Sequence, residues 1–293
     1  MIYPQLLKLT AIAVTLSLVT SCTSATKVTS ITPVNSSPSL KKPKQRIVAL
    51  TSLSADIVST LNRTKLVGIT GSRLFEGKTE FKDLPRVAEG RTAPQLEKIV
   101  ALKPDLVIGA SGFHDNVLKQ LESSGIQTLA SEVNSWEGLQ TLTKEIATAI
   151  KTDPQPLLDR YNKMLANPPQ IKGKALILAG DKPMTAPNAK SWAGDVLAKM
   201  NIANATADLQ GASGFRGYVT LSPEKVLQVS PEIVFLIETQ PGSTELVKKN
   251  SFWSQLPAVK NNRLYTFDYY GLVNPGSISS IEQAFQKIKS ITP

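Results

Sequence analysis

Short runs of strand-forming residues alternate with helical patterns along the first part of the chain. Four runs have the length and composition of buried strands: residues 47–50, 66–69, 106–108 and 128–129. Three segments between them carry apolar residues at helical spacing: 54–61, 95–102 and 116–123. Short apolar strands that alternate with helices are typical of parallel βαβ units, with helices on both faces of the sheet. The pattern predicts an α/β lobe over residues 46–134.

Beyond residue 134 the alternation stops and two helical stretches follow. The first, 136–151, places Leu139, Leu142 and Ile146 on one face. The second, 154–166, covers only about 20 Å at 1.5 Å per residue. Residues 135–167 are therefore interpreted as a helical connection.

A second alternating run begins after this connection. Its predicted strands are 175–179, 233–236 and 264–267, and its predicted helices are 191–200, 223–229 and 280–288. This pattern predicts a second lobe over 168–293. The fold class is α/β: two Rossmann-like lobes with mainly parallel sheets, joined by the helical connection. Ligands of such folds bind outside the carboxyl ends of the strands, so we expect a ligand cleft between the lobes.

One phrase occurs once in each lobe. It reads LEKIVALKPDLVI at 96–108 and PEKVLQVSPEIVFL at 223–236, with a glutamate seven residues before a proline in both copies. The apolar positions between them match one for one, which predicts the same helix-to-strand unit in each lobe. Glu97 and Glu224 would lie in the positive first turn of their helices, where a carboxylate stabilises the helix by about 0.3–1 kcal/mol. Stabilisation of the helix start would by itself explain why a glutamate stands at both positions, unless another feature gives them a further role.

The N-terminal residues have the pattern of a secretory signal. An apolar run at 9–19 follows a lone Lys8 and is far shorter than the roughly 20 residues that span a bilayer. The run ends in Val19-Thr20-Ser21-Cys22, which resembles a bacterial lipobox. Cys22 is also the single cysteine, so an internal disulfide and a tetrahedral cysteine metal site are excluded. We expect a signal peptide at 1–21 and a lipidated Cys22 that anchors the protein to a membrane.

Residues 22–45 are rich in Ser, Thr, Pro and Lys and show no periodic apolar face, which predicts a flexible tether. The signal and tether also change the meaning of the net charge of +10. Six of the 33 basic residues lie at or before Arg46, which leaves 27 against 23 acidic residues, or +4, in the folded part. We therefore expect no nucleic-acid partner, and a basic tether suits a surface of anionic lipid headgroups.

The order and spacing of several phrases resemble one protein family. They are RIVAL at 46–50, LVGIT at 66–70, LEKIVALKPDLVI at 96–108, GI at 125–126, SPEKV at 222–226 and LPAVKNNRLY at 256–265. With the lipobox and tether, they make the chain similar to the substrate-binding proteins of ABC importers, in the branch that binds vitamin B12, ferric siderophores and haem.

This resemblance implies a monomeric, extracytoplasmic binding protein without enzymatic activity. Its expected partners are an ABC permease dimer with its ATPase, and a small-molecule ligand. The resemblance also implies that Glu97 and Glu224 meet arginine pockets of the permease, one on each lobe. A rigid helix bridges the lobes in this family, and the predicted helix at 154–166 is short for that role.

Candidate ligand residues are those in loops that follow strands or precede helices at the expected cleft. In the first lobe they are Ser52, Arg73, Phe75, Arg91, Phe113 and His114; in the second they are Asn188, Trp192, Phe215, Arg216, Tyr218, Tyr269 and Tyr270. Arginine fits carboxylate, catecholate and hydroxamate oxygens, and aromatic rings cover flat ligand surfaces. Each candidate has a plainer alternative: an exposed loop arginine for Arg216, a core residue for Trp192, and one core tyrosine in the Tyr269–Tyr270 pair.

Other function classes fit the residues less well. The chain has one histidine, His114, too few for a zinc or manganese capture site. A serine hydrolase would have to use His114 as its base, and no G-x-S-x-G elbow follows a strand. His114 is either a haem-iron ligand or a loop residue without such a role. We expect capture of an iron complex, with a ferric siderophore as the first ligand class and cobalamin, then haem, as alternatives.

Overall fold

The first lobe is built on a parallel sheet with helices on both faces. The computed structural model describes residues 43–89, 92–180, 182–211, 213 and 216–291. The strands of this lobe are β1 (Ile47–Ala49), β2 (Leu66–Thr70), β3 (Arg86–Ala88), β4 (Leu106–Ala110) and β5 (Gln127–Ser131). They pair in the order β3-β2-β1-β4-β5, and every pair is parallel. The predicted parallel α/β lobe is therefore present, with β3 as a strand that the sequence pattern did not indicate.

Each face of this sheet is covered by different helices, which are α1 (Ser52–Asn62), α2 (Leu96–Ala101) and α3 (Asp115–Ser123). Ile47 and Ile108 pack on the α1 side, and Val48 and Val107 pack on the side of α2 and α3. Alternate residues of one strand thus enter separate cores, because successive side chains point to opposite faces of a sheet.

The second lobe has a mixed sheet. Its strands are β6 (Lys174–Ala179), β7 (Met184–Pro187), β8 (Ala203–Asn204), β9 (Tyr218–Leu221), β10 (Ile233–Glu238) and β11 (Leu264–Asp268). The main path is β11-β10-β6-β7-β9, in which β6, β10 and β11 are parallel and β7 is antiparallel to both its neighbours. Only residues 180–183 separate β6 from β7, too few for the crossover that a parallel pair needs. The expectation of mainly parallel sheets therefore misses this antiparallel edge.

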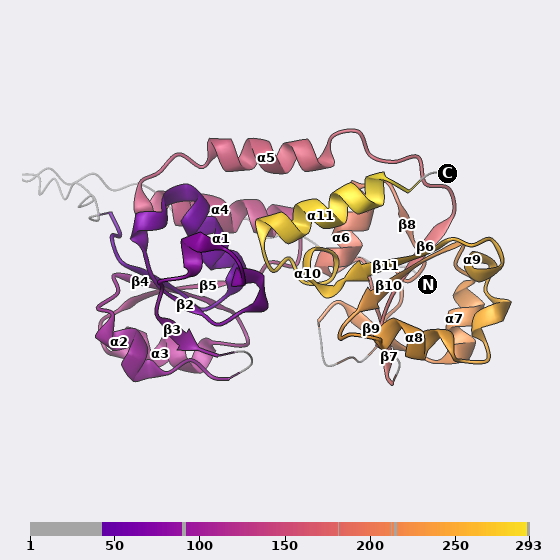
Figure 1. The fold of residues 1–293 in the computed structure, drawn as a ribbon, viewed down its shortest axis with the longest axis horizontal. Coiled ribbons are helices and arrows are strands. Elements are labelled where there is room, and N and C mark those ends of the chain that lie inside the picture. Colours follow the sequence, from indigo (N-terminus) through magenta and orange to yellow (C-terminus); the bar gives the residue numbers. More distant parts are fainter. Residues whose placement is uncertain (1–42, 90–91, 181, 212, 214–215, 292–293) are drawn as a thin grey trace, which may run out of the picture. The chain divides into compact units, whose positions relative to one another are not determined.

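The helices of the second lobe lie between and after these strands. They are α6 (Trp192–Lys199), α7 (Pro223–Val229), α8 (Ser243–Lys248), α9 (Pro257–Lys260), α10 (Tyr269–Leu272) and α11 (Ile278–Lys289). Figure 1 shows α11 beside the connecting helices, with its first residue next to α1 of the first lobe and its last turns over the second lobe. The last helix of the chain therefore also takes part in joining the lobes.

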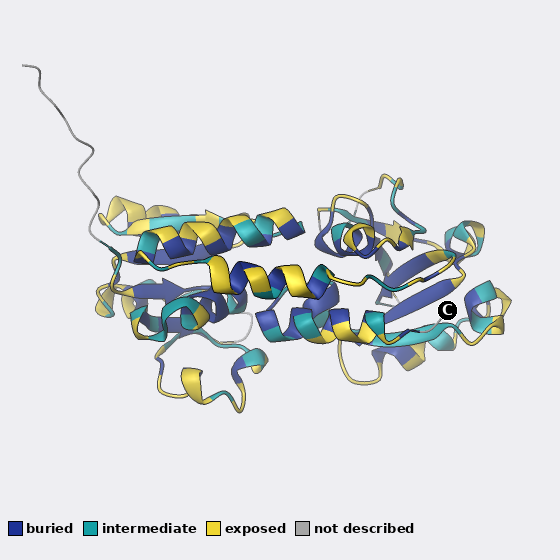
Figure 2. Ribbon diagram, turned by 90° about the horizontal axis from the view of Figure 1, so that it is seen from above, coloured by how far each residue is buried: buried dark blue, intermediate teal, exposed yellow. Residues whose placement is uncertain are grey.

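The helical connection consists of α4 (Trp136–Ile150) and α5 (Gln155–Leu165). Trp136 packs against Trp192, Phe285 and Tyr161, with ring centroids 5.9, 5.1 and 6.0 Å away. These aromatic side chains join α4, α5, α6 and α11 in one buried core. Figure 2 shows α5 with an exposed and a buried face, and buried residues of α11 belong to the same core. The short α5 is therefore not the only element that bridges the lobes.

Two aspartates cap helices of the opposite half of the molecule. Asp56 in α1 accepts a hydrogen bond of 2.7 Å from the backbone N–H of Ile278, the first residue of α11. Asp195 in α6 accepts one of 2.7 Å from the N–H of Trp136, the first residue of α4. Each carboxylate satisfies an N–H that the helix itself leaves unpaired and meets the positive helix end.

The local serine caps follow the same plan at both helices. Ser135 accepts from the N–H of Gly138, and Ser277 accepts from the N–H of Ser280, both at 3.1 Å. We call the Asp56–Ile278 and Asp195–Trp136 bonds the reciprocal caps. They link the first helix of each lobe to the helix that follows the other lobe, and so relate the halves by approximate two-fold symmetry.

Asp56 gives the stability of the fold a dependence on pH. Burial raises the pKa of its carboxyl above the usual value, although Lys78 and the Ile278 N–H act in the opposite direction. Between the usual pKa of 3.8 and the raised one, the folded state holds a proton that the unfolded chain has released. The contribution of Asp56 to stability is therefore greatest below that window and is lost as the pH rises through it.

We predict that Asp56→Asn removes this dependence. Urea unfolding of wild type and variant between pH 7 and pH 4 should show wild type gaining stability relative to the variant as the pH falls. Parallel pH dependence of the two free energies of unfolding would contradict the assignment. Asp153→Asn is the matched control, because Asp153 accepts a local hydrogen bond from the N–H of Gln155 at the exposed start of α5.

Candidate ligand-binding site

The first candidate arginine lies at the carboxyl end of β2 and contacts the second lobe. The Nη2 atom of Arg73 donates to Asp268 at 2.9 Å to Oδ1 and 3.1 Å to Oδ2. Asp268 is the last residue of β11. The guanidinium carbon of Arg73 is also 4.9 Å from the centre of the Tyr270 ring, a cation–π contact. This group therefore joins the carboxyl ends of two strands that belong to different lobes.

The second candidate arginine makes the opposite connection. Arg216 precedes β9 in the second lobe, and its Nη1 donates to Glu132 of the first lobe at 3.0 Å to Oε1 and 3.3 Å to Oε2. Glu132 directly follows β5. We call Arg73–Asp268 and Arg216–Glu132 the cross-lobe ion pairs. Each lobe thus supplies one arginine and one carboxylate.

The cross-lobe ion pairs are open to solvent. The side chains of Arg73 and Asp268 are 52% and 57% exposed, and those of Arg216 and Glu132 are 78% and 47% exposed. Ion pairs at such exposure contribute about 0–1 kcal/mol, because water and salt screen the charges. A ligand can therefore replace either carboxylate at small cost.

The three candidate tyrosines are all half-buried. The Tyr269 and Tyr270 rings lie 5.4 Å apart in an edge-to-face arrangement, and Tyr269 also packs on the main core. Tyr218 donates its hydroxyl to the Val273 carbonyl at 3.2 Å, and burial raises the pKa of that hydroxyl. Of the three, Tyr270 is the one in contact with a candidate arginine.

Two aromatic candidates are core residues. Phe75 is 4% exposed and packs on Phe81 with ring centroids 4.3 Å apart. Trp192 is 3% exposed, stacks on Trp136 and donates its indole N–H to the Gly271 carbonyl at 2.9 Å. Their positions correct the expectation that both line the cleft, because packing already covers the ring faces that a ligand would need. We leave both out of the proposed site.

The remaining candidates are scattered. Phe113 is 80% exposed, Ser52 is half-buried at the start of α1, and Asn188 is buried with its side chain bonded to backbone groups of Leu209 and Lys190. Arg91, Phe215 and the predicted lipidation site Cys22 lie outside the described residues.

His114 is poorly suited to bind iron in this conformation. Its Nδ1 accepts a hydrogen bond of 2.9 Å from the N–H of Ala110, and burial lowers the pKa of the imidazole. The ring is therefore neutral at pH 7 with its proton on Nε2, so neither nitrogen offers a free lone pair. Iron ligation would require loss of the bond to Ala110.

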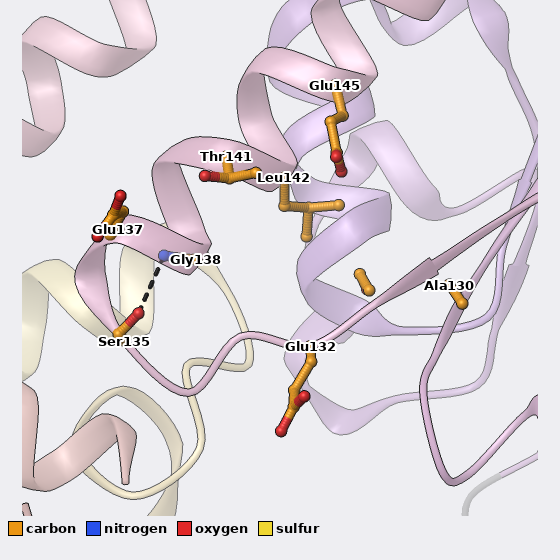
Figure 3. Close-up of a pocket in the computed structure, with 9 residues that line it drawn as sticks. Ala130, Glu132, Ser135, Glu137, Gly138, Thr141, Leu142 and Glu145 are labelled. Atoms are coloured by element: carbon orange, nitrogen blue, oxygen red, sulfur yellow. Dashed lines mark hydrogen bonds between the residues drawn. The ribbon is translucent and has the colours of Figure 1, made fainter. Parts of the chain in front are cut away.

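A hollow of about 350 Å³ lies beside the end of β5 and the first turns of α4. Figure 3 shows Glu132, Glu137 and Glu145 spaced around it rather than turned toward one another. A second hollow, of about 310 Å³, lies between α5 and α11. Within the described part of the chain, no three His, Cys, Asp or Glu side chains are arranged to hold a metal ion.

The repeated sequence phrase has the same structure in both lobes. Glu97 and Glu224 are the second residues of α2 and α7, and both are exposed. Each helix is followed, within two residues of its end, by a residue of positive φ that precedes a buried proline: Lys103 at 47° and Ser230 at 45°. The strands that follow, β4 and β10, pair with the first strand of their own lobe. A hydrogen bond from Ser222 is the main cause that lowers the pKa of Glu224.

In Figure 1, α2 and α7 both lie on the side of the sheets away from α5 and α11. The helices that carry Glu97 and Glu224 therefore have corresponding places in the two lobes.

Sequence reasoning missed the partners of the arginines. Asp268 directly follows the predicted strand 264–267, and Glu132 lies three residues after the predicted strand 128–129. The rule that ligand groups gather at the carboxyl ends of parallel strands applies to them as much as to Arg73. Carboxylates repel anions, so Asp268 and Glu132 are not expected among groups that bind an anionic ligand.

Comparison with known families supports the two-lobed assignment. The sequence model of the family described as "Periplasmic binding protein" matches residues 47–270, most of the described part of both lobes. The chain belongs to this family. No helix in the part of the chain that the structure describes is long and apolar enough to cross a membrane.

Several relatives resemble this periplasmic binding protein over most of its length. An ABC transporter substrate-binding lipoprotein of Bacillus subtilis is 24% identical over 277 residues, 88% of this chain and 83% of the relative. A vitamin B12-binding protein of Vibrio campbellii is 24% identical, over 80% of this chain and 85% of its own. A Fe(3+)-citrate-binding protein of Bacillus subtilis is 27% identical, over 61% and 58%.

Solved structures show the same fold. The periplasmic haem-binding protein of Vibrio cholerae superposes with a TM-score of 0.68 at 22% identity, covering 84% of this chain and 98% of that one. At this identity the likeness shows the fold of the periplasmic binding protein and leaves its ligand open.

Proposed function

We propose that the protein is the substrate-binding component of an ABC importer, and that it captures an anionic iron complex, in the first place a ferric siderophore. The observation that carries this proposal is the pair of exposed arginines at facing strand ends, one from each lobe. Guanidinium groups form charge-assisted, often bidentate bonds with carboxylate and other anionic oxygens. The Fe(3+)-citrate-binding relative supports an iron ligand of that kind.

Cobalamin is the second candidate, and the tyrosine group favours it. Tyr269 and Tyr270 offer half-buried aromatic surface beside Arg73, which suits a large flat ligand. The vitamin B12-binding relative spans most of the chain. Haem is the third candidate, since its carboxylates also suit the arginines, although His114 offers no free nitrogen for its iron.

The proposed function includes the partners. We infer that Glu97 and Glu224 dock the two lobes on a permease dimer with its ATPase, because they are exposed and have equivalent places in the two lobes. We further infer a monomer that acts by binding rather than catalysis, held outside the cytoplasm by a lipid on Cys22. The lipoprotein among the relatives supports the anchor.

Arg216→Ala tests the ligand class. We expect the variant to bind ferric citrate more weakly by about 1.5–3 kcal/mol, the contribution of hydrogen bonds to charged groups. Quenching of tyrosine and tryptophan fluorescence during titration measures the affinity, and mass spectrometry of the recovered ligand tests whether it stays unchanged. Lys248→Ala is the matched control, because Lys248 is a partly exposed cation paired with Glu245 within one helix.

Equal affinity of wild type and Arg216→Ala would refute the arginine role. Binding of cyanocobalamin or haemin alone would replace the siderophore with the second or third candidate. Conversion of the ligand would contradict a pure binding function.

A further inference from the structure

We propose that Glu132 and Asp268 are specificity-determining residues: each occupies a ligand arginine when the site is empty, so that only a ligand with anionic groups toward both lobes displaces them. This inference rests on the proposed function and names its ligand class more narrowly. It follows from the cross-lobe ion pairs, which place a carboxylate on both candidate arginines that the structure describes.

The pairing is reciprocal between the lobes. The first lobe supplies Arg73 and Glu132, and the second supplies Asp268 and Arg216. Each arginine donates to both oxygens of its carboxylate, at distances between 2.9 and 3.3 Å. In each pair a single Nη nitrogen makes both contacts, so each carboxylate occupies part of the guanidinium edge at which an anionic ligand group would bind.

The exchange favours anionic ligands for electrostatic reasons. A ligand carboxylate that replaces Asp268 or Glu132 keeps the arginine paired, so the swap loses little energy at these exposures. A neutral ligand gains no such bond, and where it covers a pair it removes water from two charges without replacing either contact. An anionic ligand can therefore take an arginine over from its carboxylate, whereas a neutral ligand cannot.

The same carboxylates limit the affinity for the correct ligand. Once displaced, Glu132 and Asp268 remain beside the bound anion on flexible side chains, and like charges at an interface repel. Their removal should therefore tighten binding of an anionic complex. The direction of this change in affinity distinguishes the proposal from an alternative in which the carboxylates bind the ligand. In that alternative their removal would weaken binding.

Glu132→Gln, Asp268→Asn and the double variant test the proposal with ferric citrate as the anionic probe. We expect each single variant to bind about two- to fivefold more tightly than wild type, the factor that corresponds to an exposed pair, and the double variant to show about the product. Cyanocobalamin, the probe without net charge, should change by less than twofold. Glu245→Gln is the matched control, because Glu245 pairs with Lys248 inside α8 and spans no lobes. Unchanged or weaker ferric citrate binding in Glu132→Gln and Asp268→Asn would overturn the proposal.

A ligand-free measurement keeps the proposal separate from the proposed function. Nuclear magnetic resonance of the arginine Nε–H groups, assigned with Arg73→Lys and Arg216→Lys, reports whether each guanidinium is held by its carboxylate. We expect the Arg216 signal to shift in Glu132→Gln and the Arg73 signal to shift in Asp268→Asn, with the other signal unchanged. Absence of these specific shifts would overturn the inference whatever the protein binds. A second outcome concerns the proposed function, which fails if wild type and both variants bind none of ferric citrate, haemin and cyanocobalamin. The inference depends on that function and would fail with it. Specific shifts would then show only that the ion pairs exist.

Discussion

Replacing both Glu97 and Glu224 with alanine should abolish uptake and leave ligand affinity at the wild-type level. Both glutamates are exposed at the second residue of a short helix, on α2 and α7. Neither is among the residues that make the cross-lobe ion pairs. If they bind permease arginines, their loss leaves buried cations without partners on both lobes, an effect of several kcal/mol. Uptake by cells and stimulation of the permease ATPase in membranes measure docking, and ligand titration measures binding.

The matched control is Glu137→Ala with Glu245→Ala. These glutamates also lie in the first turns of helices, α4 and α8, but outside the repeated unit. Any loss through helix-start stabilisation alone would appear in both double variants, at about 0.3–1 kcal/mol for each site. Lysine at 97 and 224 should impair uptake more than alanine does, because it adds repulsion. Retention of uptake in the Glu97/Glu224 variant would remove the docking role, and parallel loss of ligand binding would indicate misfolding.

Cys22→Ser should release the protein from membranes. Cys22 ends the apolar signal run and is the single cysteine, so no other thiol in the chain can carry the lipid. Two or more acyl chains on one residue give stable anchoring, and without them a basic tether alone binds anionic lipid weakly and in a salt-dependent manner. Fractionation of cells that express wild type or variant, with labelled fatty acid, measures both the lipid and the location.

Ser21→Ala serves as the control for changes near the processing site, because it keeps a small residue before Cys22. That variant should remain lipidated. Membrane association of Cys22→Ser that survives a wash in high salt would contradict the lipid anchor, and loss of association in Ser21→Ala would point to general disturbance of the signal.

Much of the fold follows from local patterns. Strands such as β4 and β10 are continuous apolar runs buried on both faces, and α4 carries a clear apolar stripe, so their positions could be predicted. β3 escaped because it is three residues long and begins with Arg86. β7 and β9 escaped because strands of four residues have too few positions to show a period.

The site was predictable only in part. Chemistry alone pointed to Arg73 and Arg216, but their partners lie 195 and 84 residues away in the sequence. Such pairing depends on how the lobes meet, which no local pattern encodes. The sequence also does not reveal that Trp192 is buried. Trp192 follows a loop and carries a polar N–H, but it packs in the core and donates that N–H to a backbone carbonyl.

The reciprocal caps make the two lobes incomplete without each other. A fragment that ends after α4 keeps the unpaired N–H of Trp136 but lacks Asp195, and a fragment that begins at β6 keeps the N–H of Ile278 but lacks Asp56. Each half would also expose aromatic surface around Trp136 or Phe285 that the other half covers. The chain has two lobes by architecture, but we expect them to unfold together as one cooperative unit.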